Sequence, residues 1–141
     1  MYVDTCMALK LYLPEPESQI VQQRVRGERA LRASEILSVE LASVLARKYR
    51  NREIDARDQG RVMELFRCHV DEGHWKLIPL TSEDVTGAGE LIRACQEVVG
   101  IRALDAIHLS VCRAYRSYPL FTTDPVMLKA ARFMGIPTET V

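Results

Sequence analysis

Apolar positions along this chain follow two patterns that alternate along its length. Short runs rich in aliphatic and β-branched residues predict strands. Longer stretches in which apolar residues recur every three or four positions predict helices. The predicted strands cover residues 1–3, 30–33, 75–80, 120–123 and 136–141, and the predicted helices cover 8–12, 17–27, a long segment after residue 34, 55–71, 82–98, 104–115 and 125–135.

Polar residues and prolines mark where several of these elements begin or end. Ser34 is expected to cap the long helix that follows it, and either Thr81 or Ser82 is expected to cap the helix at 82–98. Pro79 cannot donate a hydrogen bond to a neighbouring strand, so the strand at 75–80 is expected at an edge of the sheet or to end there.

Strands separated by helical segments predict an α/β fold with a mostly parallel sheet and helices on both faces. A length of 141 residues lies in the commonest range for one domain, so we expect a single domain over 1–141. Ligands of such folds gather outside the carboxyl ends of the strands. Asp4 and Asp124 each follow a predicted strand directly, which places both acids at this edge.

The composition narrows the function by exclusion. Apolar residues make up 48% of the chain and the formal net charge is zero, so attraction to nucleic acid would have to come from a local patch. Arg47, Lys48, Arg50 and Arg52 are a candidate patch, although charged residues at a helix end are usually a solvated face. No leader and no apolar run of transmembrane length are present, so we expect a soluble, cytoplasmic protein.

The four cysteines, Cys6, Cys68, Cys95 and Cys112, are widely spaced and form no CxxC pair. This spacing argues against a zinc site and against a disulfide framework, so we expect reduced and mostly buried thiols. A cysteine phosphatase would need an arginine six residues after Cys6, where Tyr12 stands.

Two further acids lie on predicted helices. Glu40 shares its helix face with Ile36, Leu37 and Val44. A carboxylate in an apolar stripe has to be paired, protonated or bound to a cation, and a salt bridge or an edge position beside water would meet that need. Asp105 lies early in its helix, where the macrodipole stabilises a carboxylate in any protein. Taken singly, neither position requires a function.

Taken together, Asp4, Glu40, Asp105 and Asp124 can meet at one edge of the predicted sheet. Carboxylates held close together repel, and their pKa values rise unless a cation neutralises them. Hard oxygen ligands without Cys or His favour Mg²⁺ or Mn²⁺ over zinc. Such a cation lowers the pKa of bound water and stabilises charge on a phosphodiester under attack. The pattern therefore predicts metal-dependent hydrolysis of a phosphate ester.

Two other protein classes that gather acids at strand ends fit poorly. A haloacid-dehalogenase-type phosphatase needs a second Asp two residues after Asp4, where Cys6 stands. A response-regulator receiver needs paired acids after the first strand and a lysine after the last core strand, and both are missing. His108 could act as a general base or ligand, but on a helix among Leu and Ile it is interpreted as a hydrogen-bonded core residue. Thr5, Thr122 and Thr123 could orient a metal-bound water or a phosphate, although threonines at strand ends commonly satisfy local backbone groups.

Four segments, in this order, resemble the motifs of PIN-domain proteins, especially the VapC-type toxins of bacterial toxin–antitoxin pairs. The first and third segments resemble the family closely, whereas the second and fourth would be weak alone. Cys6 and Met7 depart from the pattern, because small residues are more usual there. The segments are Tyr2–Pro16, Ser34–Leu41, Arg102–Leu109 and Phe121–Asp124, the last followed by Leu128 and Ala130–Ala131.

The resemblance implies a three-layer α/β/α sandwich and a Mg²⁺- or Mn²⁺-dependent endoribonuclease. Attack by a metal-activated water with departure of the 3′ oxygen would leave 5′-phosphate and 3′-hydroxyl ends. The resemblance also implies a VapB-like antitoxin as inhibitor and a homodimer. By similarity Asp4, Glu40, Asp105 and Asp124 correspond to the metal-site acids of the family. We predict Asp4 and Asp105 as the principal metal ligands, with Glu40 and Asp124 binding the metal directly or through water. The alternative is a catalytically silent PIN-like module that binds protein or RNA, but a pure binding role gives no reason for four mutually repelling acids.

Overall fold

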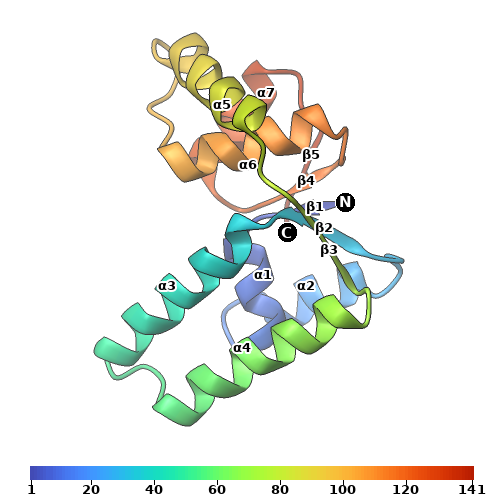
Figure 1. The fold of residues 1–141 in the computed structure, drawn as a ribbon, viewed down its shortest axis with the longest axis vertical. Helices are drawn as coiled ribbons and strands as arrows, with labels where there is room; N and C mark the ends of the chain where they lie inside the picture. The colour runs from blue at the N-terminus through green and yellow to red at the C-terminus, as the bar shows by residue number, and fades with distance from the viewer.

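A five-stranded sheet lies at the centre of the molecule in the computed structural model, which describes residues 1–141 (Figure 1). The strand order is β3-β2-β1-β4-β5, and every neighbouring pair is parallel. Parallel neighbours need a crossover connection, and each connection here contains at least one helix. The predicted α/β fold is confirmed, with a sheet that is wholly parallel. The strands are β1 (Tyr2–Val3), β2 (Leu31–Ser34), β3 (Trp75–Ile78), β4 (Leu120–Phe121) and β5 (Thr138–Glu139).

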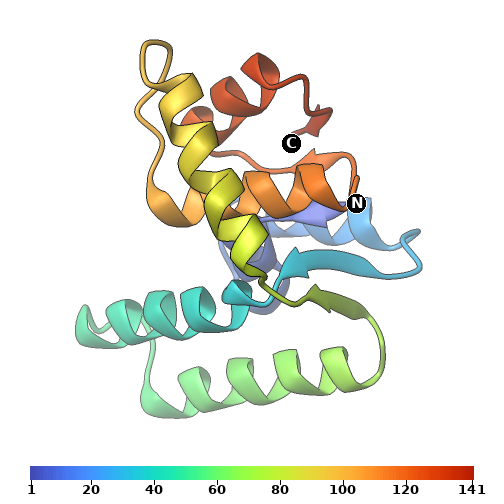
Figure 2. The ribbon, with the colours of Figure 1, turned by 45° about the horizontal axis from the view of Figure 1, so that its top comes forward.

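Seven helices form two layers, one on each side of the sheet (Figures 1 and 2). α1 to α4 pack over one face and α5 to α7 over the other, which gives the three-layer sandwich that the resemblance implied. No helix in either layer is both long enough and apolar enough to cross a membrane. The helices are α1 (Thr5–Tyr12), α2 (Ser18–Val25), α3 (Ile36–Arg50), α4 (Ala56–Asp71), α5 (Ser82–Cys95), α6 (Ala103–Ala114) and α7 (Pro125–Phe133).

The side chains of the neighbouring strands β1 and β4 point alternately into the two helix layers. Tyr2 and Leu120 are registered opposite each other and lie in the core with α5 to α7. Val3 and Phe121, the next pair, lie in the core with α1 to α4. All four side chains are fully buried, and a slip of one residue would move each of them to the wrong layer. The carboxyl ends of β1 and β4 are therefore held side by side.

Ser34 does not cap α3, contrary to the prediction. It is the last residue of β2 and pairs with Ile78 of β3, and the helix begins two residues later, after Glu35. The Ser34 hydroxyl is buried without a hydrogen-bond partner. Pairing with β3 keeps Ser34 in the sheet, so the tertiary ladder overrides a local capping preference.

Two of the four cysteines are exposed, whereas mostly buried thiols were expected. Cys95 and Cys112 lie in the core of the α5–α7 layer. Cys68 is exposed on α4, and Cys6 is exposed on the first turn of α1. All four thiols are free, as the spacing predicted.

The start of α5 gives a stability prediction that separates the two capping candidates. The Thr81 hydroxyl accepts the Asp84 N–H at 3.2 Å, and the Asp84 carboxylate accepts the Thr81 N–H at 3.0 Å, so the two residues form a capping box. We expect Thr81→Ala to lower the free energy of unfolding by about 1 kcal/mol. Ser82→Ala, one residue later on the exposed first turn, is the matched control. Equal losses in urea denaturation of the two variants would contradict this assignment.

Candidate functional site

The four predicted acids line one small pocket at the carboxyl edge of the sheet. Asp4 follows β1 and Asp124 lies just beyond β4, and these strands are neighbours. Glu40 comes from α3 and Asp105 from the first turn of α6, so both helix layers contribute. The pocket has a volume of about 90 Å³ and is lined by Asp4, Thr5, Cys6, Glu40, Asp105, His108, Asp124 and Met127.

Asp4 is the most deeply placed of these acids, with 3% of its surface exposed. One carboxylate oxygen, Oδ1, accepts the Met7 N–H at 2.8 Å and so caps α1, and Oδ2 accepts the hydroxyl of Thr122. Burial raises the pKa of Asp4 to about 6, because it outweighs the two hydrogen bonds, which lower the pKa. Capping of α1 accounts for an acid directly after β1, but a helix cap does not require a buried side chain.

Asp124 is coupled to Asp4 through one hydroxyl group. Its Oδ1 caps α7 by accepting the N–H groups of Val126 and Met127, at 2.7 and 2.9 Å. Its own N–H donates to Thr122 Oγ1 at 3.0 Å, and the Thr122 hydroxyl donates to Asp4. Thr122 is fully buried, so it fixes the two acids relative to each other.

Glu40 reaches the pocket from α3 and is held by two donors. Its Oε2 accepts the Thr5 hydroxyl and lies 2.6 Å from His108 Nε2. Burial raises the pKa of Glu40. The hydrogen bonds from His108 and Thr5, together with the charge interaction with His108, lower the pKa by more than burial raises it and leave it below its usual value. Glu40 is therefore an ionised acid in an apolar stripe, held by hydrogen bonds.

Asp105 completes the group as a half-buried carboxylate. Burial, followed by the negative charges of Asp124 and Glu40, raises the pKa of Asp105. No lysine or arginine lines the pocket. These two negative charges raise the pKa of Asp105 more than the charges of His108 and Arg102 lower it, which is the electrostatic situation that a cation relieves.

Comparison with known proteins places this chain in a family. The family model for the PIN domain matches residues 1–133. The chain belongs to the PIN-domain family. The resemblance seen in the sequence is confirmed, and because PIN-domain proteins are nucleases, membership supports hydrolysis of nucleic acid as the activity.

Solved structures agree with this assignment at the level of the fold. The PIN-domain chain is similar to VapBC2 from Rickettsia felis, whose crystal structure holds a DNA fragment from its promoter. The TM-score is 0.69 at 15% identity, and the likeness covers 99% of this chain and 96% of that one. At this identity the likeness establishes the architecture alone. No curated protein sequence matches this chain.

The donor set of this PIN-domain pocket fits a hard divalent cation, although its side chains do not converge into a coordination shell. All the acidic donors are oxygens, as Mg²⁺ and Mn²⁺ prefer. No group of three or more His, Cys, Asp or Glu side chains is placed closely enough to hold a metal ion. Asp4 and Asp124 each use a carboxylate oxygen to cap a helix, and Glu40 uses Oε2 to bond His108 and Thr5.

Residues that support the acids were only partly recognised from sequence. His108 is buried and hydrogen-bonded, as predicted, but it lines the pocket and contacts Glu40. Thr122 bonds local backbone as expected, because its Oγ1 accepts the Asp124 N–H, but its hydroxyl also donates to Asp4. The Thr5 hydroxyl donates to Glu40 and not to local backbone. The spacing of three residues between Asp105 and His108 on one helix was the available signal for a shared face.

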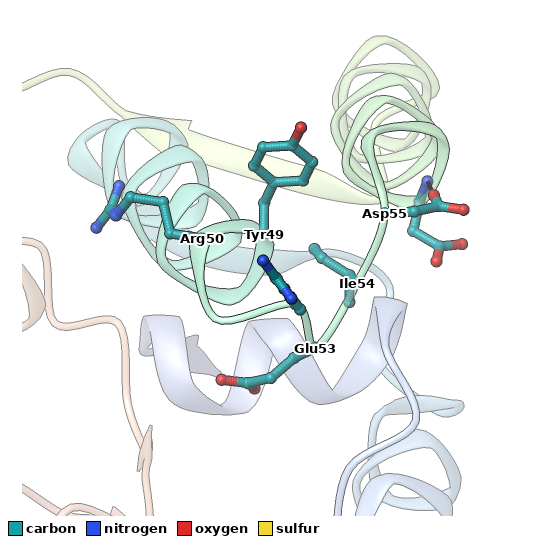
Figure 3. Close-up of a pocket in the computed structure, with 7 residues that line it drawn as sticks. Tyr49, Arg50, Glu53, Ile54 and Asp55 are labelled. Carbon is teal, nitrogen blue, oxygen red and sulfur yellow. Dashed lines mark hydrogen bonds between the residues drawn. The ribbon is translucent and has the colours of Figure 1, made fainter.

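Two of the basic residues considered for RNA binding, Arg50 and Arg52, line a different pocket, at the turn between α3 and α4 (Figure 3). The volume of this pocket is about 600 Å³. Beside it, Lys48 forms ion pairs with Glu15 at 2.7 Å and with Glu53 at 3.0 Å. Acids in and beside the pocket therefore balance this basic cluster. The acids that line it are Glu53, Asp55 and Asp58.

Proposed function

We propose that this PIN-domain protein is a divalent-metal-dependent endoribonuclease and the toxin of a toxin–antitoxin pair. The observation that carries the proposal is the pocket at the carboxyl edge of the sheet, which is lined by four acids and by no lysine or arginine. Family membership supplies nucleic acid as the substrate class. RNA rather than DNA, and Mg²⁺ or Mn²⁺ as the metal, are the parts that experiment has to test.

Asp4 and Asp105 are proposed as the principal metal ligands, with Glu40 and Asp124 bound directly or through water. When bound, the cation supplies the positive charge that makes water nucleophilic and stabilises the departing 3′ oxygen. The raised pKa values of Asp4 and Asp105 belong to carboxylates whose charge is costly without a cation. Thr5 and Thr122 hold Glu40 and Asp4 by hydrogen bonds, which limits their rotation.

The size of the pocket indicates how RNA would approach it. About 90 Å³ is far below the roughly 300–1,000 Å³ of pockets that enclose small molecules. It admits ions, water and the oxygens of one phosphate, but not a nucleobase. The proposed substrate is therefore an exposed segment of RNA whose backbone crosses the mouth of the pocket, while its bases are recognised elsewhere.

The direct test incubates the purified protein with single-stranded and structured RNAs in Mg²⁺ or Mn²⁺, with matched reactions in EDTA. We expect cleavage only with the metal, and products with 5′-phosphate and 3′-hydroxyl ends. Cleavage that continues in EDTA would rule out metal dependence. Loss of all cleavage with every RNA, together with no thermal shift on adding Mn²⁺, would favour the catalytically silent binding module.

A protein inhibitor and a second copy of the chain are proposed as partners. The similar Rickettsia felis structure is a VapBC2 assembly bound to promoter DNA, and this supports a VapB-like antitoxin for the present chain. A short DNA-binding protein encoded by an adjacent reading frame should then co-purify with it and suppress cleavage. Light scattering of the free chain tests the homodimer, and a monomeric mass would remove that part of the proposal.

Removal of the hydroxyl that links two acids should reduce the rate of cleavage. Thr122→Val keeps the shape of a fully buried side chain but leaves Asp4 Oδ2 without its donor and the Asp124 N–H without its acceptor. We expect the rate to fall about tenfold, as with other residues that orient ligating carboxylates. The matched control is Thr123→Val, because the Thr123 hydroxyl makes only long contacts to sulfur. A similar loss in both variants would show a general packing effect.

A further inference from the structure

A buried chain of hydrogen bonds runs from the sheet to Glu40 and passes through two side chains that the proposed mechanism does not use. The Ser34 N–H donates to the Tyr2 hydroxyl oxygen at 2.9 Å, and this hydroxyl lies 2.8 Å from His108 Nδ1. His108 Nε2 lies 2.6 Å from Glu40 Oε2. Tyr2 and His108 are fully buried, and their rings pack edge to face. This chain of hydrogen bonds therefore links the backbone of β2 to Glu40, an acid of the pocket on α3.

The donors and acceptors along this chain assign its protons. The Tyr2 hydroxyl has two hydrogen-bond partners, and the Ser34 N–H is a donor that cannot accept a proton. The partner that can accept the Tyr2 hydroxyl proton is therefore His108 Nδ1. Nδ1 is then an acceptor, and Nε2 carries the ring proton that is donated to Glu40.

This arrangement has a consequence for Glu40, which lines the acidic pocket. Both of its donors, His108 and Thr5, use Oε2, so Oε1 has no protein donor. A packing role alone would be filled by leucine, which needs no hydrogen-bond partners in a core.

We propose that His108, oriented by the Tyr2 hydroxyl, is a positioning residue that holds Glu40 with Oε1 presented to a divalent cation. The inference rests on the proposed function, because it assigns a role at the same site. Groups that hydrogen-bond to ligating side chains fix their orientation, and losing one typically weakens metal binding 10- to 100-fold. The role of Tyr2 is to select the ring tautomer that donates to Glu40.

The test measures Mn²⁺ affinity without RNA, by electron paramagnetic resonance of the free ion, with circular dichroism to verify folding. His108→Leu, which has no donor, should bind Mn²⁺ about 10- to 100-fold more weakly than the wild type. His108→Gln restores an amide N–H near the position of Nε2 and should recover most of that loss. Tyr2→Phe keeps the imidazole but removes the group that orients it, and should weaken binding less than His108→Leu.

The protein contains a second tyrosine–histidine pair, which provides a matched control. His69 Nδ1 on α4 lies 3.1 Å from the Tyr12 hydroxyl on α1, and both residues lie outside the acidic pocket. His69→Leu should leave the affinity for Mn²⁺ unchanged. Asp4→Asn should lose it, which verifies that the acidic site is the one being measured.

The outcomes separate this inference from the function on which it rests. A wild type that binds no Mn²⁺ would overturn the metal-dependent function and the inference together. Wild-type affinity in His108→Leu, with binding lost in Asp4→Asn, would overturn only the role of His108. An equal loss in His108→Gln and His108→Leu would show that shape, not the donor, is what matters, and would also overturn it. If His108→Leu does not fold, His108→Gln and Tyr2→Phe decide, and wild-type affinity in Tyr2→Phe would contradict the orienting role.

Discussion

Replacement of Asp4 by Asn is expected to lower the rate of RNA cleavage roughly 1,000-fold, or by about 4 kcal/mol of transition-state stabilisation. Asn keeps the size of the side chain and an oxygen that can accept the Met7 N–H and cap α1. It removes the negative charge from the most buried acid of the pocket. The loss should therefore come from weaker binding of the cation, while the fold remains intact. Single-turnover cleavage at saturating RNA, with Mn²⁺ varied, measures it.

Asp55→Asn is the matched control for this experiment. Asp55 caps α4 as Asp4 caps α1, by accepting the N–H three residues later, but it lies at the α3–α4 turn and outside the acidic pocket. Its replacement makes the same chemical change at an equivalent cap and should leave the rate of cleavage unchanged. If Asp4→Asn cleaves at the wild-type rate, Asp4 is a structural cap and the proposed ligand set is wrong.

The second large effect is on stability, measured in EDTA. Burial raises the pKa of Asp4 to about 6 from 3.8, so the folded state binds a proton more tightly than the unfolded state does. The stability contributed by this proton is complete below pH 3.8 and is lost as the pH rises through 6. Asp4→Asn has no such proton to lose. Relative to the wild type, the variant should gain roughly 2–3 kcal/mol in unfolding free energy between pH 4 and pH 8.

Urea denaturation of both proteins across this pH range provides the measurement, and the difference between them cancels the titration of residues they share. Mn²⁺ should stabilise the wild type at pH 8 and have little effect at pH 4, because protons and the cation compete for the same carboxylate. A constant difference between variant and wild type across the range would show that Asp4 has an ordinary pKa in the folded state.

The alternation of strands and helices was readable from sequence because it follows from local periodicity. The residues of β1 and β4 are apolar on both faces, as in a buried parallel sheet. The end of α7 was predicted from Gly135, which has a φ of 68° that favours glycine. Asp4 and Asp124 could be placed at the functional edge because each comes just after a strand. The resemblance to PIN-domain proteins was also recognised from local information, namely the residues of four short segments. The capping role of Ser34 was wrong, because pairing with β3 depends on residues more than forty positions away.

The fold class, the four candidate acids and the edge at which two of them lie could be predicted from residue type and short-range spacing. The way in which each acid is held depends on tertiary contacts. Thr122 meets Asp4 across 118 residues of chain, Tyr2 meets His108 across 106, and His108 meets Glu40 across 68. A hydrogen bond depends on the direction of individual side-chain atoms, and no local pattern encodes that direction between distant segments. The packing of both helix layers against one sheet therefore determines which oxygens of the four acids remain available for a cation.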